Sequence, residues 1–502
     1  MSLAIVYSRA KLGIQAPAVT VEVHLANGMP SLTMVGLPET AVRESKDRVR
    51  SALQNARLEF PSLKRITINL APADLPKEGG RFDLAVALGL LAASGQIPAD
   101  CLSQCEVLGE LALSGELRPV QGVLPAALAC RDQQRTLILP KENAAEAALV
   151  RGVNIIAAEH LLELCEHLRG DRLLPEVPSS TPQLTPASLP DLRDVQGQAQ
   201  AKRALIVAAA GSHNLLLLGP PGTGKTLLAS RLPGILPALN EHEALEVAAI
   251  QSVCGRDLLH SWPVRPFRAP HHGASAAALV GGGSQPRPGE ISQAHHGVLF
   301  LDELPEFDRK VLEMLREPME SGIIHIARAR EQLSFPARFQ LIAAMNPCPC
   351  GYQGDPSGRC RCSADQVERY RSKLSGPLLD RIDLHLPMHN EAFSLTGPTE
   401  GRPDSREAAA QVSAARSRQL DRQECLNAHL DVAGVRQYCS LTDNDASWLE
   451  QAVTRLGLSR RGSHRALKVA RTLADLEHAT QISRAHLAEA LQYRQLDRQR
   501  LS

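Results

Sequence analysis

Aromatic residues, long hydrophobic runs and an excess of either charge are all nearly absent from this sequence. Phe, Trp and Tyr make up 3% of the 502 residues, so its cores must be filled by Leu, Val, Ile and Ala, and few rings remain to stack on nucleic-acid bases. The 55 Lys and Arg residues nearly balance 54 Asp and Glu residues, which excludes a global basic field and leaves only local contacts to a polyanion. Because the sequence has no run of about 18 apolar residues and no signal peptide, we expect a soluble cytoplasmic protein.

Cysteine is also uncommon, yet four of the eleven cysteines fall within one short stretch, "CPCGYQGDPSGRCRC". Cys348 and Cys350 form one C-x-C pair, and Cys360 and Cys362 form a second pair nine residues later. Two such pairs, joined by a Gly-rich loop, can fold back so that four thiolates meet as a tetrahedron, the arrangement that structural Zn²⁺ prefers. We therefore predict a structural zinc site at these four cysteines. Disulfides and free thiols are the alternatives.

The chain divides at two stretches that lack the apolar pattern of a folded core. Residues 175–190, "PEVPSSTPQLTPASLP", carry five prolines among Ser and Thr, which removes backbone donors and favours an extended linker. Residues 391–405, "EAFSLTGPTEGRPDS", separate a Gly-rich middle from a helical tail. At about 150 residues per domain, the length fits three domains. We predict these domains at 1–174, 191–390 and 405–502.

The first and last domains differ in their periodicity. In the first, Val19–Leu25 and Ile66–Leu70 alternate apolar and polar residues, the pattern of half-buried strands, whereas 39–56 and 81–94 have helical spacing. The first domain is therefore predicted to be α/β. The tail is predicted to be a small helical bundle, because it carries short amphipathic stretches with Asp or Ser near their starts at 443–456, 463–479 and 483–496.

The middle domain opens with a motif for phosphate binding. Residues 214–226, "NLLLLGPPGTGKT", join an apolar run, typical of a buried parallel strand, to the pattern GxxxxGK[ST]. In such a loop the backbone N–H groups wrap the phosphates, Lys225 reaches the β and γ phosphates, and the Thr226 hydroxyl binds Mg²⁺. The order of strand, loop and helix disfavours a plain Gly-rich turn. We therefore predict an ATP site made by Gly219, Pro220, Pro221, Gly222, Thr223, Gly224, Lys225 and Thr226.

A second apolar run ends in two adjacent carboxylates. Residues 297–304 read "GVLFLDEL", which repeats the pattern of a buried strand. Asp302 would hold the Mg²⁺ ion, and Glu303 would polarise the attacking water. This motif is weak alone, but it gains strength because it follows a phosphate-binding loop.

Two further residues fit an ATPase that works as a ring. Asn346 ends the apolar stretch "FQLIAAM" and would orient the water near the γ-phosphate, with an Asn-Pro turn as the alternative. Arg381, in "GPLLDRIDLHL", precedes another apolar strand. Its guanidinium suits a clamp on the nucleotide of a neighbouring subunit, because it binds phosphate oxygens bidentately. An ordinary surface cluster of charges is the alternative for Arg381.

With these motifs in place, the chain resembles the AAA+ ATPases of the magnesium-chelatase group and, within that group, the YifB or ComM-like proteins. The resemblance covers almost the whole chain. Its most specific stretches are "RPFRAPHHGASAAALVGGGSQPRPGEISQAHHGVLFLDELPEF" (265–307), "FPARFQLIAAMNPCPCGY" (335–352) and "LKVARTLADL" (467–476). His271 and His272 belong to the first stretch, but adjacent side chains diverge, so we do not expect a joint metal site there.

The resemblance implies roles for single residues and a state of assembly. It gives a sensor role to Asn346 and a finger role to Arg381. It also implies a second sensor arginine on the helical lid, where Arg465 is the better match and Arg461 the competitor. The insert in "AAALVGGGSQPRPGE" would project toward the pore of a ring, most simply a homohexamer that uses ATP and Mg²⁺.

The resemblance also implies a function. Proteins of the ComM type are expected to act as DNA helicases or translocases that promote branch migration during recombination in natural transformation, with branched or single-stranded DNA and other recombination proteins as partners. A protein-remodelling chaperone is the first alternative and a magnesium-chelatase motor subunit the second. A local grip on DNA would involve basic residues whose alternative role is ordinary surface solvation, namely Arg287, Arg328 and Arg330.

The first domain resembles the domain shared by Lon proteases and the recombination ATPase RadA. The similar stretches are "NLAPADLPKEGGRFDLAVALGLL" and "LGELALSGELRPVQGVLPAAL". Lon-type hydrolysis needs a Ser nucleophile beside a Lys base. Here the segment after "PKEG" reads "GRFDLA" without a Ser, and Leu124 and Pro125 stand where the Lys is expected. We therefore predict a scaffold or binding domain without protease activity.

Overall fold

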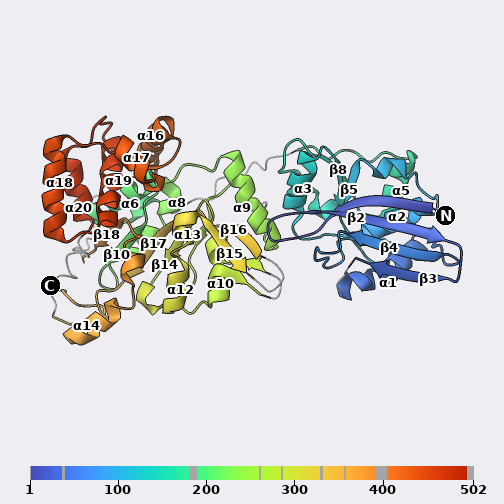
Figure 1. Ribbon diagram of the computed structural model, residues 1–502, viewed down its shortest axis with the longest axis horizontal. Helices are drawn as coiled ribbons and strands as arrows, with labels where there is room; N and C mark the ends of the chain where they lie inside the picture. The colour runs from blue at the N-terminus through green and yellow to red at the C-terminus, as the bar shows by residue number, and fades with distance from the viewer. Residues whose placement is uncertain are drawn as a thin grey trace. The chain divides into compact units, whose positions relative to one another are not determined.

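The computed structural model describes residues 2–36, 40–179, 189–258, 262–283, 286–327, 332–355, 358–389 and 404–494. They belong to two compact units (Figure 1), one made of Met1–Thr185 with Glu241–Trp262 and the other of Pro186–Asn240 with Pro263–Ser502. Helix α9 (Glu241–Val253) thus belongs to the first unit, although in sequence it lies inside the predicted ATPase segment. The boundaries proposed from the linkers remain predictions. None of the helices described is long and apolar enough to cross a membrane.

The first unit is built on a mixed sheet of seven strands in the order β3-β4-β2-β1-β5-β8-β9. Strands β1, β2 and β4 pair antiparallel, whereas β3 with β4, and the β1-β5-β8-β9 side, pair parallel. The two strands predicted from alternation are confirmed as β2 and β4. The strands are β1 (Ser2–Arg9), β2 (Ala18–Ala26), β3 (Ser31–Val35), β4 (Arg65–Ala71), β5 (Cys105–Val107), β8 (Thr136–Pro140) and β9 (Asn154–Ala158), with a separate pair β6 (Glu110–Leu111) and β7 (Leu117–Arg118).

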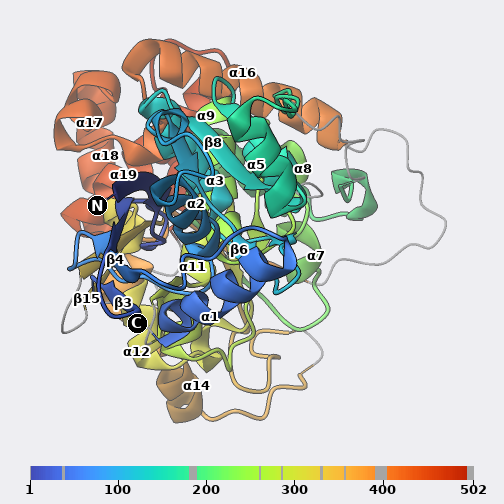
Figure 2. The same cartoon turned by 90° about the vertical axis from the view of Figure 1, so that its right-hand side faces the viewer.

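Helix α2 (Asp83–Ala93) is the central helix of the first unit. All of its residues are buried, and it packs on β1, β2 and α1. It approaches β2 closely at Gly89, where a Cβ would lie 2.6 Å from Val23 Cγ2. Helix α3 packs on β8 (Figure 2) and on α9. Helix α5 packs on β9. Besides α2 and α9, the α-helices of this unit are α1 (Thr40–Asn55), α3 (Val123–Asp132), α4 (Ala144–Ala147) and α5 (Leu161–Arg169).

The second unit contains a parallel five-stranded sheet in the order β11-β14-β17-β10-β18. Its three central strands consist wholly of buried residues, as the apolar runs predict. The strands are β10 (Leu215–Leu218), β11 (Phe267–Arg268), β14 (Val298–Leu301), β17 (Gln340–Met345) and β18 (Leu384–Pro387). Two small hairpins join β12 (Gly281–Gly282) to β13 (Arg287–Pro288) and β15 (Ile323–Ala327) to β16 (Gln332–Pro336). The helices of this part are α6 (Ala199–Gly211), α7 (Lys225–Ala229), α8 (Leu232–Ile235), α10 (Ala276–Val280), α11 (Glu290–Gln293), α12 (Arg309–Met314), α13 (Pro318–Ser321), α14 (Ala364–Arg371) and α15 (Gly376–Leu379).

The described part of the chain ends in a helical region, drawn in orange and red in Figure 1. The three predicted helices of the tail are confirmed as α18 (Asp443–Leu456), α19 (Arg460–Leu476) and α20 (Arg484–Gln492). Two more, α16 (Ser405–Gln423) and α17 (Val432–Tyr438), were not predicted. Helix α16 packs on α6 and α19 through a buried stripe that includes small alanines, so it lacks the strong apolar period that reveals a helix in a sequence. The predicted fold class, α/β with a parallel sheet and a helical C-terminal region, is confirmed.

Candidate functional site

The predicted phosphate-binding residues meet at the carboxyl ends of three neighbouring parallel strands. Strand β10 is followed at once by the loop 219–224 and helix α7, β14 is followed by Asp302, and β17 is followed by Asn346. Ligands of open parallel sheets bind beyond the carboxyl ends of the strands. This edge of the second unit is therefore a candidate nucleotide site.

The loop after β10 folds around the ammonium group of Lys225. Gly222 and Gly224 have φ of +82° and +84°, the left-handed region that favours glycine. Lys225 is buried, and its Nζ donates to the carbonyl oxygens of Gly219 at 2.7 Å and Pro220 at 2.9 Å. The loop thus has the curvature that lets backbone N–H groups surround an anion at the start of a helix.

The same ammonium group also interacts with residues that follow the neighbouring strands β17 and β14. Lys225 Nζ also donates to Asn346 Oδ1 at 3.2 Å. Burial lowers the pKa of Lys225, while the negative charges of Asp302 and Glu303 act in the opposite direction. The ammonium, the two carboxylates and the amide therefore form one electrostatic unit, as expected for residues at one sheet edge.

Asp302 and Glu303 lie side by side but have different environments. The Thr226 hydroxyl donates to Asp302 Oδ2 at 2.7 Å, which brings together two hard oxygen ligands of the kind that Mg²⁺ uses in nucleotide sites. The backbone N–H of Glu303 donates to Asp302 Oδ1 at 2.9 Å, and Glu303 itself has φ of +51°. Non-glycine residues rarely adopt this conformation, and it is often found at functional sites.

A contact that the sequence did not predict joins His272 to Glu303. His272 Nδ1 lies 3.3 Å from Glu303 Oε2, and the ring meets Phe307 edge to face. His272 follows β11, and β11 pairs with β14, the strand that leads to Glu303. The His pair within the stretch 265–307 was the available signal, but the sequence does not show that β11 and β14 are neighbours. The adjacent His271 is instead an acceptor for the backbone N–H of Gly273 at 3.1 Å.

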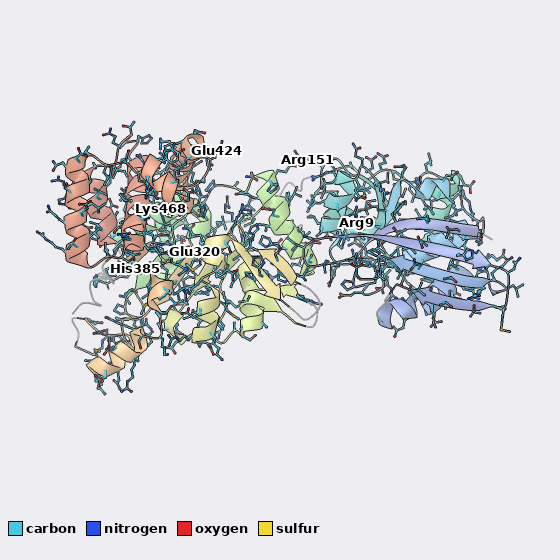
Figure 3. All side chains as sticks on the ribbon, in the orientation of Figure 1. Arg9, Arg151, Glu320, His385, Glu424 and Lys468 are labelled. Atoms are coloured by element: carbon cyan, nitrogen blue, oxygen red, sulfur yellow. The ribbon has the colours of Figure 1, made fainter. Side chains whose placement is uncertain are left out.

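Arg381 lies at the amino ends of the strands, opposite to the carboxyl ends where the phosphate loop begins. It precedes β18, whose amino end is level with the amino end of β10. The amino ends and the carboxyl ends of these strands are separated by four residues of strand, about 13 Å. The buried Arg381 donates from Nη2 to Glu320 Oε2 at 3.0 Å and from Nη1 to the carbonyl oxygen of Pro377 at 2.8 Å. Glu320, marked in Figure 3, also contacts Arg461.

The other predicted sensor, Arg465, is at this edge as well. It donates to Asp383, the residue before β18. Burial favours a raised pKa for Asp383, but the Arg465 charge and hydrogen bonds from His213 and the Asn214 backbone outweigh it and hold this pKa well below its usual range. Burial, followed by the charges of Arg316 and Arg465, lowers the pKa of Arg381. Arg381 and Arg465 lie at the amino ends of the strands, whereas Lys225 follows the carboxyl end of β10. One chain therefore does not bring the two arginines together with Lys225.

The four predicted metal ligands come together in the loop after β17. Cys348 Sγ lies 3.3 Å from Cys350 Sγ and 3.8 Å from Cys360 Sγ, and the last two sulfurs are 3.6 Å apart. The four sulfur atoms of the cluster, including that of Cys362, all lie within 4.8 Å of one another. A tetrahedral Zn²⁺ site with bonds of about 2.3 Å places its sulfurs about 3.8 Å apart. The cluster therefore fits the dimensions of a zinc centre.

The predicted insert is the short hairpin β12–β13 that follows α10. Gly281, Gly282 and Gly283 all have positive φ, between +105° and +145°. Arg287 on the second strand is exposed. The other two arginines proposed to grip DNA, Arg328 and Arg330, lie outside the described residues.

Comparisons with known proteins cover nearly the whole chain. Three family models match, namely Magnesium chelatase, subunit ChlI at residues 191–395, Subunit ChlI of Mg-chelatase at 21–143, and Magnesium chelatase, subunit ChlI C-terminal at 402–494. The chain is 54% identical to Uncharacterized protein YifB of Salmonella typhimurium and 54% identical to Competence protein ComM of Haemophilus influenzae. It is also 53% identical to Uncharacterized protein YifB of Escherichia coli. Each of these alignments covers 99% of this chain and 98% of the relative.

Proposed function

The chain belongs to the magnesium-chelatase-like family that includes YifB and ComM and is an AAA+-type ATPase, and from this premise we propose that it is a ring-forming motor that drives branch migration of DNA. The observation that carries the ATPase half is the meeting of Lys225, Thr226, Asp302 and Asn346 at one sheet edge. ATP and Mg²⁺ are the cofactors that this family implies.

The residues divide the work of hydrolysis. Lys225 and the loop N–H groups would hold the phosphates. Thr226 and Asp302 would hold Mg²⁺ through their oxygen atoms, and the ion would supply positive charge beside the phosphates. Glu303 accepts a proton from the attacking water, and Asn346 orients that water. His272 Nδ1 contacts Glu303 Oε2 and so holds this carboxylate in place.

The position of Arg381 supports the proposal that the protein assembles into a ring. Because Arg381, Arg461 and Arg465 lie at the end of the sheet opposite the phosphate loop, we propose that they act on the nucleotide of a neighbouring subunit rather than on that of their own chain. In a head-to-tail ring, the arginines of one subunit can face the phosphate loop of the next subunit. We propose that this ring is a hexamer.

The DNA half of the proposal rests on the relatives and on local charge. One relative carries the name Competence protein ComM, which supports a role in natural transformation. With a formal net charge of +1, the chain must grip DNA locally, and Arg287 on the second strand of the glycine-rich hairpin offers an exposed cation for a phosphate. Such contacts are independent of base sequence and weaken as salt rises.

The proposal is tested with a synthetic four-way DNA junction whose arms carry two labels. We expect wild-type protein with ATP and Mg²⁺ to separate the junction into two duplexes, and Glu303→Gln to bind the junction without separating it. A wild type that hydrolyses ATP yet neither binds nor resolves any branched DNA at low salt overturns the DNA half. Stimulation of hydrolysis by an unfolded protein then supports a remodelling ATPase, and stimulation by a porphyrin with chelatase subunits supports the role named in the family models.

The cofactor set also includes a structural Zn²⁺ held by the four cysteines. We expect about one zinc per chain, and expect Cys360→Ser to lose the metal and lower the melting temperature by about 5 °C or more, because thiolate ligation contributes directly to folding. Metal analysis by mass spectrometry and a thermal melt measure both effects. Cys425→Ser, a half-buried cysteine outside the cluster, is the matched control and should keep its zinc. Protein prepared without chelators that carries no zinc rules the site out.

A further inference from the structure

The cysteine cluster and the phosphate loop are joined by one tight turn. The backbone N–H of Gly351 donates to the carbonyl oxygen of Cys348 at 2.9 Å, which closes a turn that contains two of the four thiols. Gly351 has φ of +84°, so glycine suits this position. The path of the turn is therefore fixed both by its backbone and by the meeting of its thiols with those of Cys360 and Cys362.

This turn lies directly against the phosphate loop. A Cβ at Gly351 would lie 2.8 Å from Pro221 Cδ and 3.3 Å from Pro221 Cγ, and 3.8 Å from Asn346 Cγ. Asn346 in turn accepts a hydrogen bond from Lys225, and the backbone N–H of Gly219 donates to the carbonyl oxygen of Met345 at 3.2 Å. Gly351 thus contacts the phosphate loop at Pro221 and the proposed sensor at Asn346.

The other glycines of the same loop make no such contact. Gly354 and Gly358 also have left-handed φ, of +77° and +64°, but a Cβ at either position would meet nothing within 4 Å. Among the described glycines of this loop, only Gly351 therefore lies close to the nucleotide site. Because protein interiors are close-packed and transmit strain, a displacement of this turn should also displace Pro221.

We propose that the four-cysteine centre is a metal-dependent brace for the phosphate loop, so that zinc occupancy sets the affinity for ATP through the contact of Gly351 with Pro221. This inference rests on the proposed zinc site and ATPase activity. In the metal-bound state, the turn stays packed beside Pro221 and Asn346, which holds the loop in the form that surrounds phosphate. When the metal is lost, the turn is released and the loop samples other conformations, so binding weakens.

The contact is tested by Gly351→Ala against Gly354→Ala, with zinc content and the affinity for a fluorescent ATP analogue measured on each purified protein. Both changes strain a left-handed backbone, but only the methyl group added at position 351 meets Pro221. We expect at least about tenfold weaker binding for Gly351→Ala with its zinc retained, and a change below about twofold for Gly354→Ala. Adding Pro221→Ala to Gly351→Ala should restore part of the affinity, because alanine lacks the Cγ and Cδ atoms that the new Cβ meets.

The metal dependence is tested by removing zinc from the wild type with a chelator and following secondary structure by circular dichroism. We expect ATP-analogue binding to weaken at least about tenfold while the spectrum is kept, and to return when zinc is added back. Zinc removal from Gly351→Ala should have a much smaller effect, because the brace is already displaced. Unchanged affinity in zinc-free wild type, or equal affinity of Gly351→Ala and Gly354→Ala, overturns the proposal. A zinc-loaded wild type that binds no ATP overturns the proposed ATPase function itself.

Discussion

Lys225→Ala should weaken ATP binding by about 100-fold or more. The ammonium group is buried, has donors directed to the phosphate loop and to Asn346, and supplies the positive charge at this sheet edge. Two charge-assisted hydrogen bonds to phosphate oxygens at about 1.5 kcal/mol each correspond to about two factors of ten in affinity. Titration with a fluorescent ATP analogue measures the loss directly. Equal affinity in wild type and Lys225→Ala contradicts the assignment of this loop.

The matched comparison is Glu303→Gln, which separates hydrolysis from binding. The amide has the shape of the carboxylate and still reaches His272, but it does not accept a proton from water. We therefore expect ATP to bind within about twofold of wild type and kcat to fall about 100-fold or more, the range found when a general base is lost. A variant that loses binding together with turnover contradicts a purely catalytic role for Glu303.

Arg381→Ala should abolish nearly all ATP hydrolysis in the assembled protein, by about 1,000-fold, because arginine fingers contribute at least this much. Since Arg381 lies at the sheet edge opposite Lys225, the loss should be repaired from a neighbouring subunit. Lys225→Ala and Arg381→Ala chains are mixed in equal amounts. In random mixing, half of the phosphate loops and half of the Arg381 positions are intact, so an intact loop faces an intact Arg381 at about a quarter of the interfaces. Hydrolysis should return to about that fraction of the wild-type rate.

The control for this experiment is proof of mixing. Chains with two different fluorescent labels report energy transfer only in mixed assemblies. No recovery of hydrolysis in assemblies shown to be mixed contradicts action between subunits. Arg381→Lys is a second test, because lysine keeps the charge but loses the planar fork that binds phosphate oxygens bidentately.

The sequence indicated which contiguous motifs come together in space, while the roles of their residues remain predictions. The loop from Gly219 to Thr226 and the pair Asp302 and Glu303 each follow an apolar strand, so parallel pairing of these strands brings them to one edge without further information. The cysteine cluster was predictable for a similar reason, because two C-x-C pairs leave few ways for the chain to fold back.

Contacts between segments far apart in sequence were not predictable. His272 meets Glu303, and Arg381 meets Glu320, only because the strand order and the short helix α13 place them together. The close approach of Gly351 to Pro221 has no signature beyond one glycine among several in its loop. Helix α9 belongs to the first unit although the chain returns to the second unit on both sides of it. Packing of this kind is set by shape, which a single sequence does not show.

The most direct test of the proposed DNA motor is the rate of ATP hydrolysis by purified wild-type protein, measured without DNA and with single-stranded, duplex and branched DNA. The proposal predicts that branched or single-stranded DNA raises the rate several-fold, and that this stimulation declines steeply between low and moderate salt, since phosphate contacts release counterions. A protein that hydrolyses ATP at one rate under all four conditions at low salt, and is stimulated by an unfolded protein instead, contradicts the proposal.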